Sequence, residues 1–94
     1  MKFAIFVDFD SDNIDNIMAV NKQRMEQMKI NPDKYFKPII MPHIIGSSDS
    51  VMLVVETNDE KHLANYIIDY SGLMDIRIEP LISTLDVEPT VKRE

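Results

Sequence analysis

Two segments of the chain alternate as β-strands do, yet they are hydrophobic on both faces. They are residues 2–9, KFAIFVDF, and residues 51–56, VMLVVE. Successive side chains of a strand point to opposite faces, so one face of each segment can serve the core while the other needs a second cover. The apolar side chains on that second face are Ala4, Phe6, Met52 and Val54. Both segments are predicted to be central strands of a sheet.

Two other segments have apolar residues at helical spacing. Residues 12–29 predict a helix with Ser11 or Asp12 as N-cap, which ends before Asn31-Pro32-Asp33. Its apolar stripe, which we expect to pack on the core, consists of Ile14, Ile17, Met18, Met25 and Met28.

The second helix is predicted to follow the capping-box pattern of Thr57 and Glu60, although Asn58 could also cap it. We expect Gly72 to end this helix in a left-handed conformation. The face that packs on the core is predicted from Leu63, Ala64, Ile67 and Tyr70.

The two remaining strand-like segments carry features of sheet edges. Residues 35–45 contain Pro38 and Pro42, which cannot donate to a strand ladder and so predict an edge strand or a bulge. A turn at 46–49 joins this segment to residues 51–56 as a hairpin. Residues 74–81 alternate apolar side chains with charged ones, which are Asp75, Arg77 and Glu79.

The order strand, helix, strand, strand, helix, strand predicts an α+β protein with a ferredoxin-like βαββαβ plait. Right-handed crossovers place both helices on one face of a four-stranded antiparallel sheet with strand order 4-1-3-2. The strands that are hydrophobic on both faces are then central. We expect one domain over residues 1–82 and a C-terminal tail over 83–94.

The helix-free face of this sheet is predicted to be too apolar to remain in water. Besides the four side chains of the central strands, we expect Ile39 and Met41 to contribute to it. Each large apolar side chain gains roughly 1.5 to 3 kcal/mol from burial. A second copy of the chain is the simplest cover, because the patch then needs only to complement itself. We therefore expect a homodimer with a cleft for a small molecule.

Several residues also resemble a known group of proteins. They are the turn glycine Gly46, Glu56 at a strand end, the acidic segment 57–60, the helical aromatics Tyr66 and Tyr70, and Pro80 in the last strand. The chain resembles the dimeric α+β barrel superfamily, and most closely a family of short uncharacterised bacterial and archaeal proteins, which usually has Trp at the two tyrosine positions. The resemblance implies dimerisation and a cleft between sheet and helices. Superfamily members include isomerases, monooxygenases, chlorite dismutases and effector-binding domains, so it selects no reaction.

The composition limits the classes of binding partner that we expect. The 94 residues have a formal net charge of −6, which opposes binding to nucleic acid. There is no cysteine and no apolar run long enough to span a membrane, so we expect a cytoplasmic protein that binds neither nucleic acid nor membrane. We expect no cofactor and no metal; His62 is predicted to face solvent, not to bind haem.

Candidate chemistry lies on the helix-free face. His43 could act as a general acid or base, although we favour a structural role at a strand end, with a hydrogen bond to the backbone. Arg77 could hold a carboxylate with Asp8 or Glu56 as base, or these charges could form salt bridges at a dimer rim. The predicted ligand-binding residues are Phe6, Asp8, Met52, Glu56 and Arg77.

Three functions are compatible with these features. The first is a homodimer that binds a small, partly apolar ligand in the cleft between sheet and helices. The second is a cofactor-free isomerase or monooxygenase that uses His43 as general acid or base. The third is a protein-interaction module whose sheet pairs with another chain.

Overall fold

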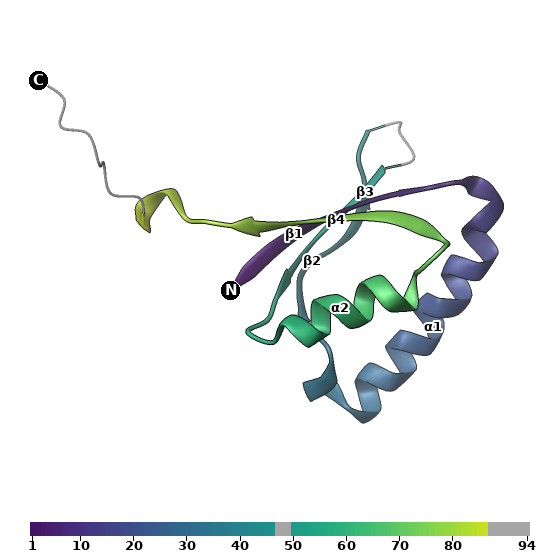
Figure 1. Ribbon diagram of the computed structural model, residues 1–94, viewed down its shortest axis with the longest axis horizontal. Helices are drawn as coiled ribbons and strands as arrows, with labels where there is room; N and C mark the ends of the chain where they lie inside the picture. The colour runs from purple at the N-terminus through teal and green to yellow at the C-terminus, as the bar shows by residue number, and fades with distance from the viewer. Residues whose placement is uncertain (47–49, 87–94) are drawn as a thin grey trace, which may run out of the picture.

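A computed structural model describes residues 1–46 and 50–86 and shows a four-stranded antiparallel sheet of order β2-β3-β1-β4. The strands are β1 (Lys2–Phe9), β2 (Lys37–Ile44), β3 (Ser50–Glu56) and β4 (Met74–Leu81). The helices are α1 (Ile14–Ile30) and α2 (Glu60–Asp69). Both helices lie on the same side of the sheet (Figure 1). The predicted ferredoxin-like plait is confirmed.

Short 3-10 turns flank these elements, at Ser11–Asn13, Pro32–Lys34 and Thr84–Asp86. The last of them follows β4, within the segment predicted as a tail. Residues 87–94 and most of the predicted hairpin turn, residues 47–49, lie outside the described residues. The domain boundary at residue 82 stays a prediction.

The two central strands are those that are hydrophobic on both faces. On the side that the helices cover, Ile5 of β1 and Val55 of β3 are fully buried. On the helix-free side, Ala4 and Val54 lie opposite each other in the register. A central position suits these strands because their neighbours pair with both backbone edges while apolar side chains fill both faces.

β2 is an edge strand whose pairing with β3 is interrupted twice, between Pro38 and Ile40 and between Ile40 and His43. A proline has no N–H for the ladder, so the strand shifts its register around the two prolines. As a result Ile40 is opposite Val54 on the helix-free face. The prediction that Ile39 and Met41 lie on this face is wrong for Met41, which lines a cavity on the helix side.

α1 packs on the core through only part of the predicted stripe. Ile17 and Arg24 are its buried residues, whereas Met18 and Met25 are each 59% exposed. The N-cap of α1 is Asn13, not Ser11 or Asp12, and its side chain makes no capping hydrogen bond. Asp10 instead caps the preceding 3-10 turn, where it accepts a hydrogen bond from the backbone N–H of Asp12 at 3.1 Å. The methionine stripe therefore does not form the helix's buried face.

The N-cap of α2 is Asp59, whose side chain accepts a hydrogen bond from the backbone N–H of Lys61 at 2.9 Å. The N-cap is thus neither Thr57 nor Asn58. After the helix, Gly72 has a φ of 78°, as predicted for the residue that reverses the chain. No helix among the described residues is long and apolar enough to cross a membrane.

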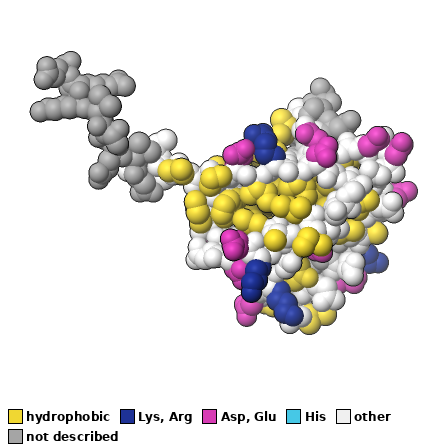
Figure 2. Space-filling view, in the orientation of Figure 1, with side chains coloured by type: hydrophobic (Ala, Val, Ile, Leu, Met, Phe, Trp, Pro, Cys, Tyr) yellow, Lys and Arg dark blue, Asp and Glu magenta, His cyan; other side chains and the backbone are white. Residues whose placement is uncertain are grey.

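Hydrophobic side chains gather in a band along β4 and between that strand and α2 (Figure 2). From these two elements Leu63, Ile76 and Ile78 are half-buried against the core. The layer between sheet and helices is therefore only partly closed from solvent at this edge.

Candidate functional site

A cavity of about 410 Å³ lies between the sheet and the helices. Its apolar wall is formed from α1, β2 and β3 and from the segment that precedes β2. The residues of this wall are Met25, Met28, Phe36, Pro38, Met41, Pro42 and Leu53. The volume is within the range of small-molecule sites. An apolar molecule would fill this space more favourably than water does.

The polar groups of the cavity come from α1 and α2, and they are Asn21, Arg24, Lys29, Tyr66 and Tyr70. Arg24 donates a hydrogen bond from Nη1 to Oδ2 of Asp69, and the Tyr70 hydroxyl donates to Oδ1 of Asn21. Both contacts join α1 to α2. They fix the two helices at the wall of the cavity.

Aromatic rings surround the Arg24 guanidinium. Its Cζ lies 5.0 to 5.9 Å from the ring centroids of Tyr35, Phe36, Tyr66 and Tyr70. The rings also contact one another, with centroids 5.4 Å apart for Phe36 and Tyr66 and 4.9 Å apart for Tyr66 and Tyr70. Cation–π attraction and the ion pair with Asp69 together account for an arginine that is only 7% exposed.

The Tyr66 hydroxyl differs from that of Tyr70. Within the described part of the chain it has no hydrogen-bond partner, although the whole residue is only 7% exposed. Yet no fully buried side-chain oxygen or nitrogen of the described residues lacks a partner. The hydroxyl oxygen must therefore be accessible, and Tyr66 lines the cavity.

Both tyrosines keep their protons more strongly than a tyrosine in water does. Burial raises the pKa of Tyr66 above its usual 10.0, and Tyr70 raises it further, while Arg24 opposes both effects. Burial also raises the pKa of Tyr70, against the effect of Arg24. At neutral pH both hydroxyls are neutral hydrogen-bonding groups.

The candidate residues predicted from the sequence lie on the opposite side of the sheet. Four of them form one row across all four strands, because His43 pairs with Met52, Met52 with Phe6, and Phe6 with Arg77. His43 and Arg77 are at the two ends of the row, three strand spacings apart or roughly 14 Å. A substrate that touched both would have to span the sheet.

The other two predicted site residues lie in the outer rows of this face. Asp8 pairs with Ser50 and Asp75, whereas Glu56 pairs with Lys2 and Lys37. None of the predicted site residues, His43, Phe6, Asp8, Met52, Glu56 and Arg77, lines the large cavity.

Arg77 covers part of the helix-free face. Its Cζ lies 4.4 Å from the centroid of the Phe6 ring, and its Nη1 lies 3.4 Å from Oε1 of Glu79. Among the described residues no ion pair joins it to Asp8 or Asp75. The guanidinium thus lies on an aromatic ring and beside one carboxylate.

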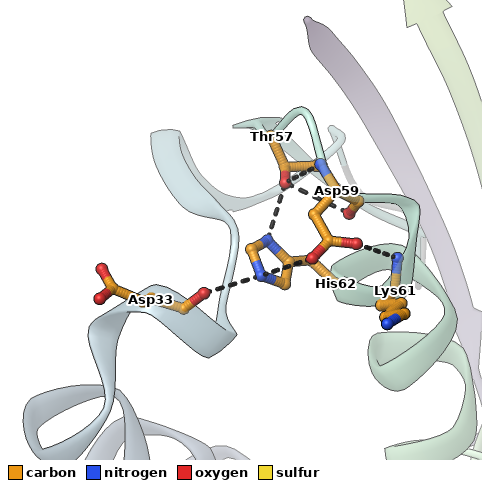
Figure 3. A network of polar contacts seen from close by, with 5 residues as sticks. All are labelled: Asp33, Thr57, Asp59, Lys61 and His62. Carbon is orange, nitrogen blue, oxygen red and sulfur yellow. Dashed lines mark hydrogen bonds and ion pairs between the residues drawn. The ribbon is translucent and has the colours of Figure 1, made fainter.

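The two histidines have different surroundings. His43 is exposed, and its Nδ1 contacts the backbone oxygen of Met41. The side chain of His62 is only 14% exposed, so the prediction that it faces solvent is wrong. Its Nε2 donates to the backbone oxygen of Asp33 at 2.9 Å, and its Nδ1 lies 2.7 Å from Oγ1 of Thr57 (Figure 3).

His62 therefore fastens the start of α2 to the turn before β2. A backbone oxygen can only accept, so Nε2 carries a proton and, in the neutral ring, Nδ1 accepts from the Thr57 hydroxyl. That hydroxyl also accepts from the N–H of Asp59 at 3.0 Å. Among the described residues no group of three or more His, Cys, Asp and Glu side chains could hold a metal ion.

Sequence reasoning missed the Arg24 cluster. Arg24 is seven residues after Ile17 and therefore on the same face of α1, where an arginine needs a buried partner. Asp69, beside Tyr70 at the end of α2, is such a partner. The pattern was present in the sequence, but the pairing of the two helices depends on the fold.

A family model described as a domain of unknown function, DUF3303, matches residues 1–94, which is the whole chain. No curated protein and no solved structure matches this sequence. The ferredoxin-like fold and the match to an uncharacterised family agree with the resemblance seen in the sequence as far as fold and lack of a known function are concerned. The chain belongs to the DUF3303 family.

Proposed function

We propose that this protein is a homodimer that binds a small, partly apolar molecule in the cavity between sheet and helices. The observation that carries the proposal is the cavity itself, about 410 Å³ with an apolar wall and polar groups from two helices. Small-molecule sites have this character, in which apolar walls supply affinity and a few polar groups fix orientation.

The homodimer is supported by the helix-free face. Its middle rows contain Phe6, Met52, Ala4, Val54 and Ile40, and the rows beside them are charged. Ala4 and Val54 are already buried in one subunit, while Ile40 is 41% exposed. An apolar centre with a charged rim suits an interface around a two-fold axis.

The dimer is tested by sedimentation velocity on the full chain and two matched variants. Met52→Glu places a charge at the centre of the helix-free face and should convert the dimer to a 10.9 kDa monomer. Ile68→Glu places the same charge on α2, where Ile68 is 66% exposed, and should leave the dimer intact. A wild-type chain that is monomeric at micromolar concentration would contradict this part of the proposal.

Binding in the cavity is tested with N-phenyl-1-naphthylamine, an uncharged dye whose fluorescence rises in apolar surroundings. Met28→Glu adds a charge to the cavity wall and should weaken dye binding about tenfold or more. Met18→Glu adds it to the same helix outside the cavity and should change little. Equal effects of the two variants, or no dye binding by the wild type, would contradict binding at this site.

A further inference from the structure

The proposed function leaves the ligand's chemical class open, and the charges around the cavity restrict it. Among the described residues that line the cavity, Arg24 and Lys29 are cationic and none is acidic. Yet the whole chain has 16 acidic residues against 10 basic ones. A cavity with two cations in an acidic protein favours an anion by charge complementarity.

Arg24 has hydrogen-bonding capacity left for such an anion. Nη1 donates to Asp69, and within the described part of the chain Nε and Nη2 have no partner. Because no fully buried side-chain nitrogen there lacks a partner, these two atoms are accessible. Arg24 borders two cavities.

The second cavity is unsuited to an anion. It has a volume of about 160 Å³ and is bordered by Asp69, whose carboxylate would repel a negative charge. Among the described residues that line the larger cavity there is no carboxylate, and one of them is Tyr66, whose hydroxyl has no partner in the described part of the chain. An anion would therefore be bound in the larger cavity.

The ion pair with Asp69 also limits the charge of the ligand. Because that carboxylate already offsets much of the Arg24 charge, and Lys29 is exposed, the site can compensate one negative charge better than two. A phosphate dianion would be left partly uncompensated. The remaining wall is apolar and includes three methionines, which adapt to ligands of varied shape.

We propose that the ligand is a small monocarboxylic acid with an apolar body, whose carboxylate accepts hydrogen bonds from Arg24 and the Tyr66 hydroxyl. Lys29 adds attraction at the cavity wall, and the apolar body lies among Met25, Met28 and Met41. This assignment rests on the proposed function, because it names the class of molecule that the same cavity would hold.

The test compares 2-naphthoate with 2-naphthamide, which have the same ring system but differ in charge. Each is titrated at pH 8 against the full chain carrying N-phenyl-1-naphthylamine. We expect 2-naphthoate to displace the dye at concentrations at least about tenfold lower than 2-naphthamide requires, since hydrogen bonds to charged groups are stronger than those between neutral groups. Equal displacement by the two compounds would overturn the assignment but leave cavity binding intact.

Variants distinguish recognition of the carboxylate by Arg24 and Tyr66 from attraction by the overall charge of the site. Asp69→Asn removes the carboxylate that competes for Arg24, so it should increase the affinity for 2-naphthoate several-fold and not that for 2-naphthamide. Tyr66→Phe should reduce 2-naphthoate affinity about threefold or more. The matched control is Tyr35→Phe, whose ring lies 5.0 Å from Arg24 but outside the large cavity.

Lys29→Met, at an exposed position, provides a test that does not depend on the buried ion pair. It should weaken 2-naphthoate binding two- to fivefold, whereas Lys22→Met on the same helix should not. If neither Lys29→Met nor Asp69→Asn changes the preference for 2-naphthoate over 2-naphthamide, the assignment is wrong. If the dye does not bind the wild type, both the assignment and the proposed function fail.

Discussion

Both faces of the sheet contain apolar side chains, but these side chains are covered in different ways. On the helix side Ile5 and Val55 are fully buried beneath the helices, yet an open cavity remains beside them. On the helix-free side, long side chains of the sheet itself cover their neighbours, as Arg77 covers Phe6. The helix side thus contains a cavity, in which we propose that a ligand binds, whereas the helix-free side is the surface on which we propose that a second copy packs.

The difference has a cause in α1. Its buried residues are Ile17 and Arg24, and the guanidinium of Arg24 lies among aromatic rings at the edge of the cavity. Met25 and Met28 line that cavity. A charged group in the core therefore leaves apolar room next to it, which a well-packed aliphatic core would not do.

The largest effect is expected at two adjacent valines of β3, which point to opposite faces of the sheet and so test the comparison of those faces. Val55→Ala removes two methyl groups from the fully buried helix side and should lower the free energy of unfolding by about 2 to 3 kcal/mol. Val54→Ala, on the helix-free side, should cost about 1 kcal/mol in dilute solution. Urea unfolding followed by circular dichroism measures both.

Protein concentration sharpens this prediction. The loss from Val55→Ala should be constant over a hundredfold range of concentration, whereas that from Val54→Ala should grow as subunits associate. A concentration-independent loss at both positions would contradict a partner on the helix-free face.

The histidines provide a second comparison with a smaller effect. His62→Ala breaks two hydrogen bonds that fasten α2 to the turn before β2 and should cost about 1 to 2 kcal/mol. His43→Ala, at an exposed site on the helix-free face, should change stability by less than about 0.5 kcal/mol. Thermal unfolding of both variants measures this, and a larger loss from His43→Ala would reverse the assigned roles.

The smallest effect is expected in alkaline solution. The pKa values of Tyr66 and Tyr70 are raised above 10.0 in the folded chain. Below about pH 10 both folded and unfolded chains keep these protons, so stability is unaffected by them. Above it the unfolded chain releases protons that the folded chain retains, so stability falls by up to about 1.4 kcal/mol per pH unit for each tyrosine.

Tyr66→Phe removes one of these two contributions. Its free energy of unfolding, measured in urea at pH 9, 10 and 11, should therefore fall less steeply than that of the wild type. Parallel curves for the two proteins would show that the Tyr66 proton is not retained by burial.

The architecture could be predicted because the hydrophobic pattern of each strand indicates whether the strand is central or at an edge of the sheet. Alternation that is apolar on both faces placed β1 and β3 in the centre, and prolines or charges placed β2 and β4 at the edges. The register of β2 could not be predicted, since two proline-induced shifts decide which side chains reach each face. Met41 consequently lies at the cavity instead of the helix-free face.

The candidate site was harder to predict than the fold. The alternation in β1, β3 and β4 correctly grouped Phe6, Asp8, Met52, Glu56 and Arg77 on one face. It could not reveal a cavity on the other side, which depends on how α1 packs and on the ion pair between Arg24 and Asp69. Contacts between helices distant in sequence are not visible in the periodicity of either helix.

The central claim is that the ligand is bound on the helix side of the sheet, and the seven methionines offer a direct measurement. In a protein labelled with ¹³C at the methionine methyl groups, titration with 2-naphthoate should shift the signals of Met25, Met28 and Met41, which line the cavity. Met52, on the helix-free face, should not shift. A shift confined to Met52 would place the ligand on the opposite face and contradict the account.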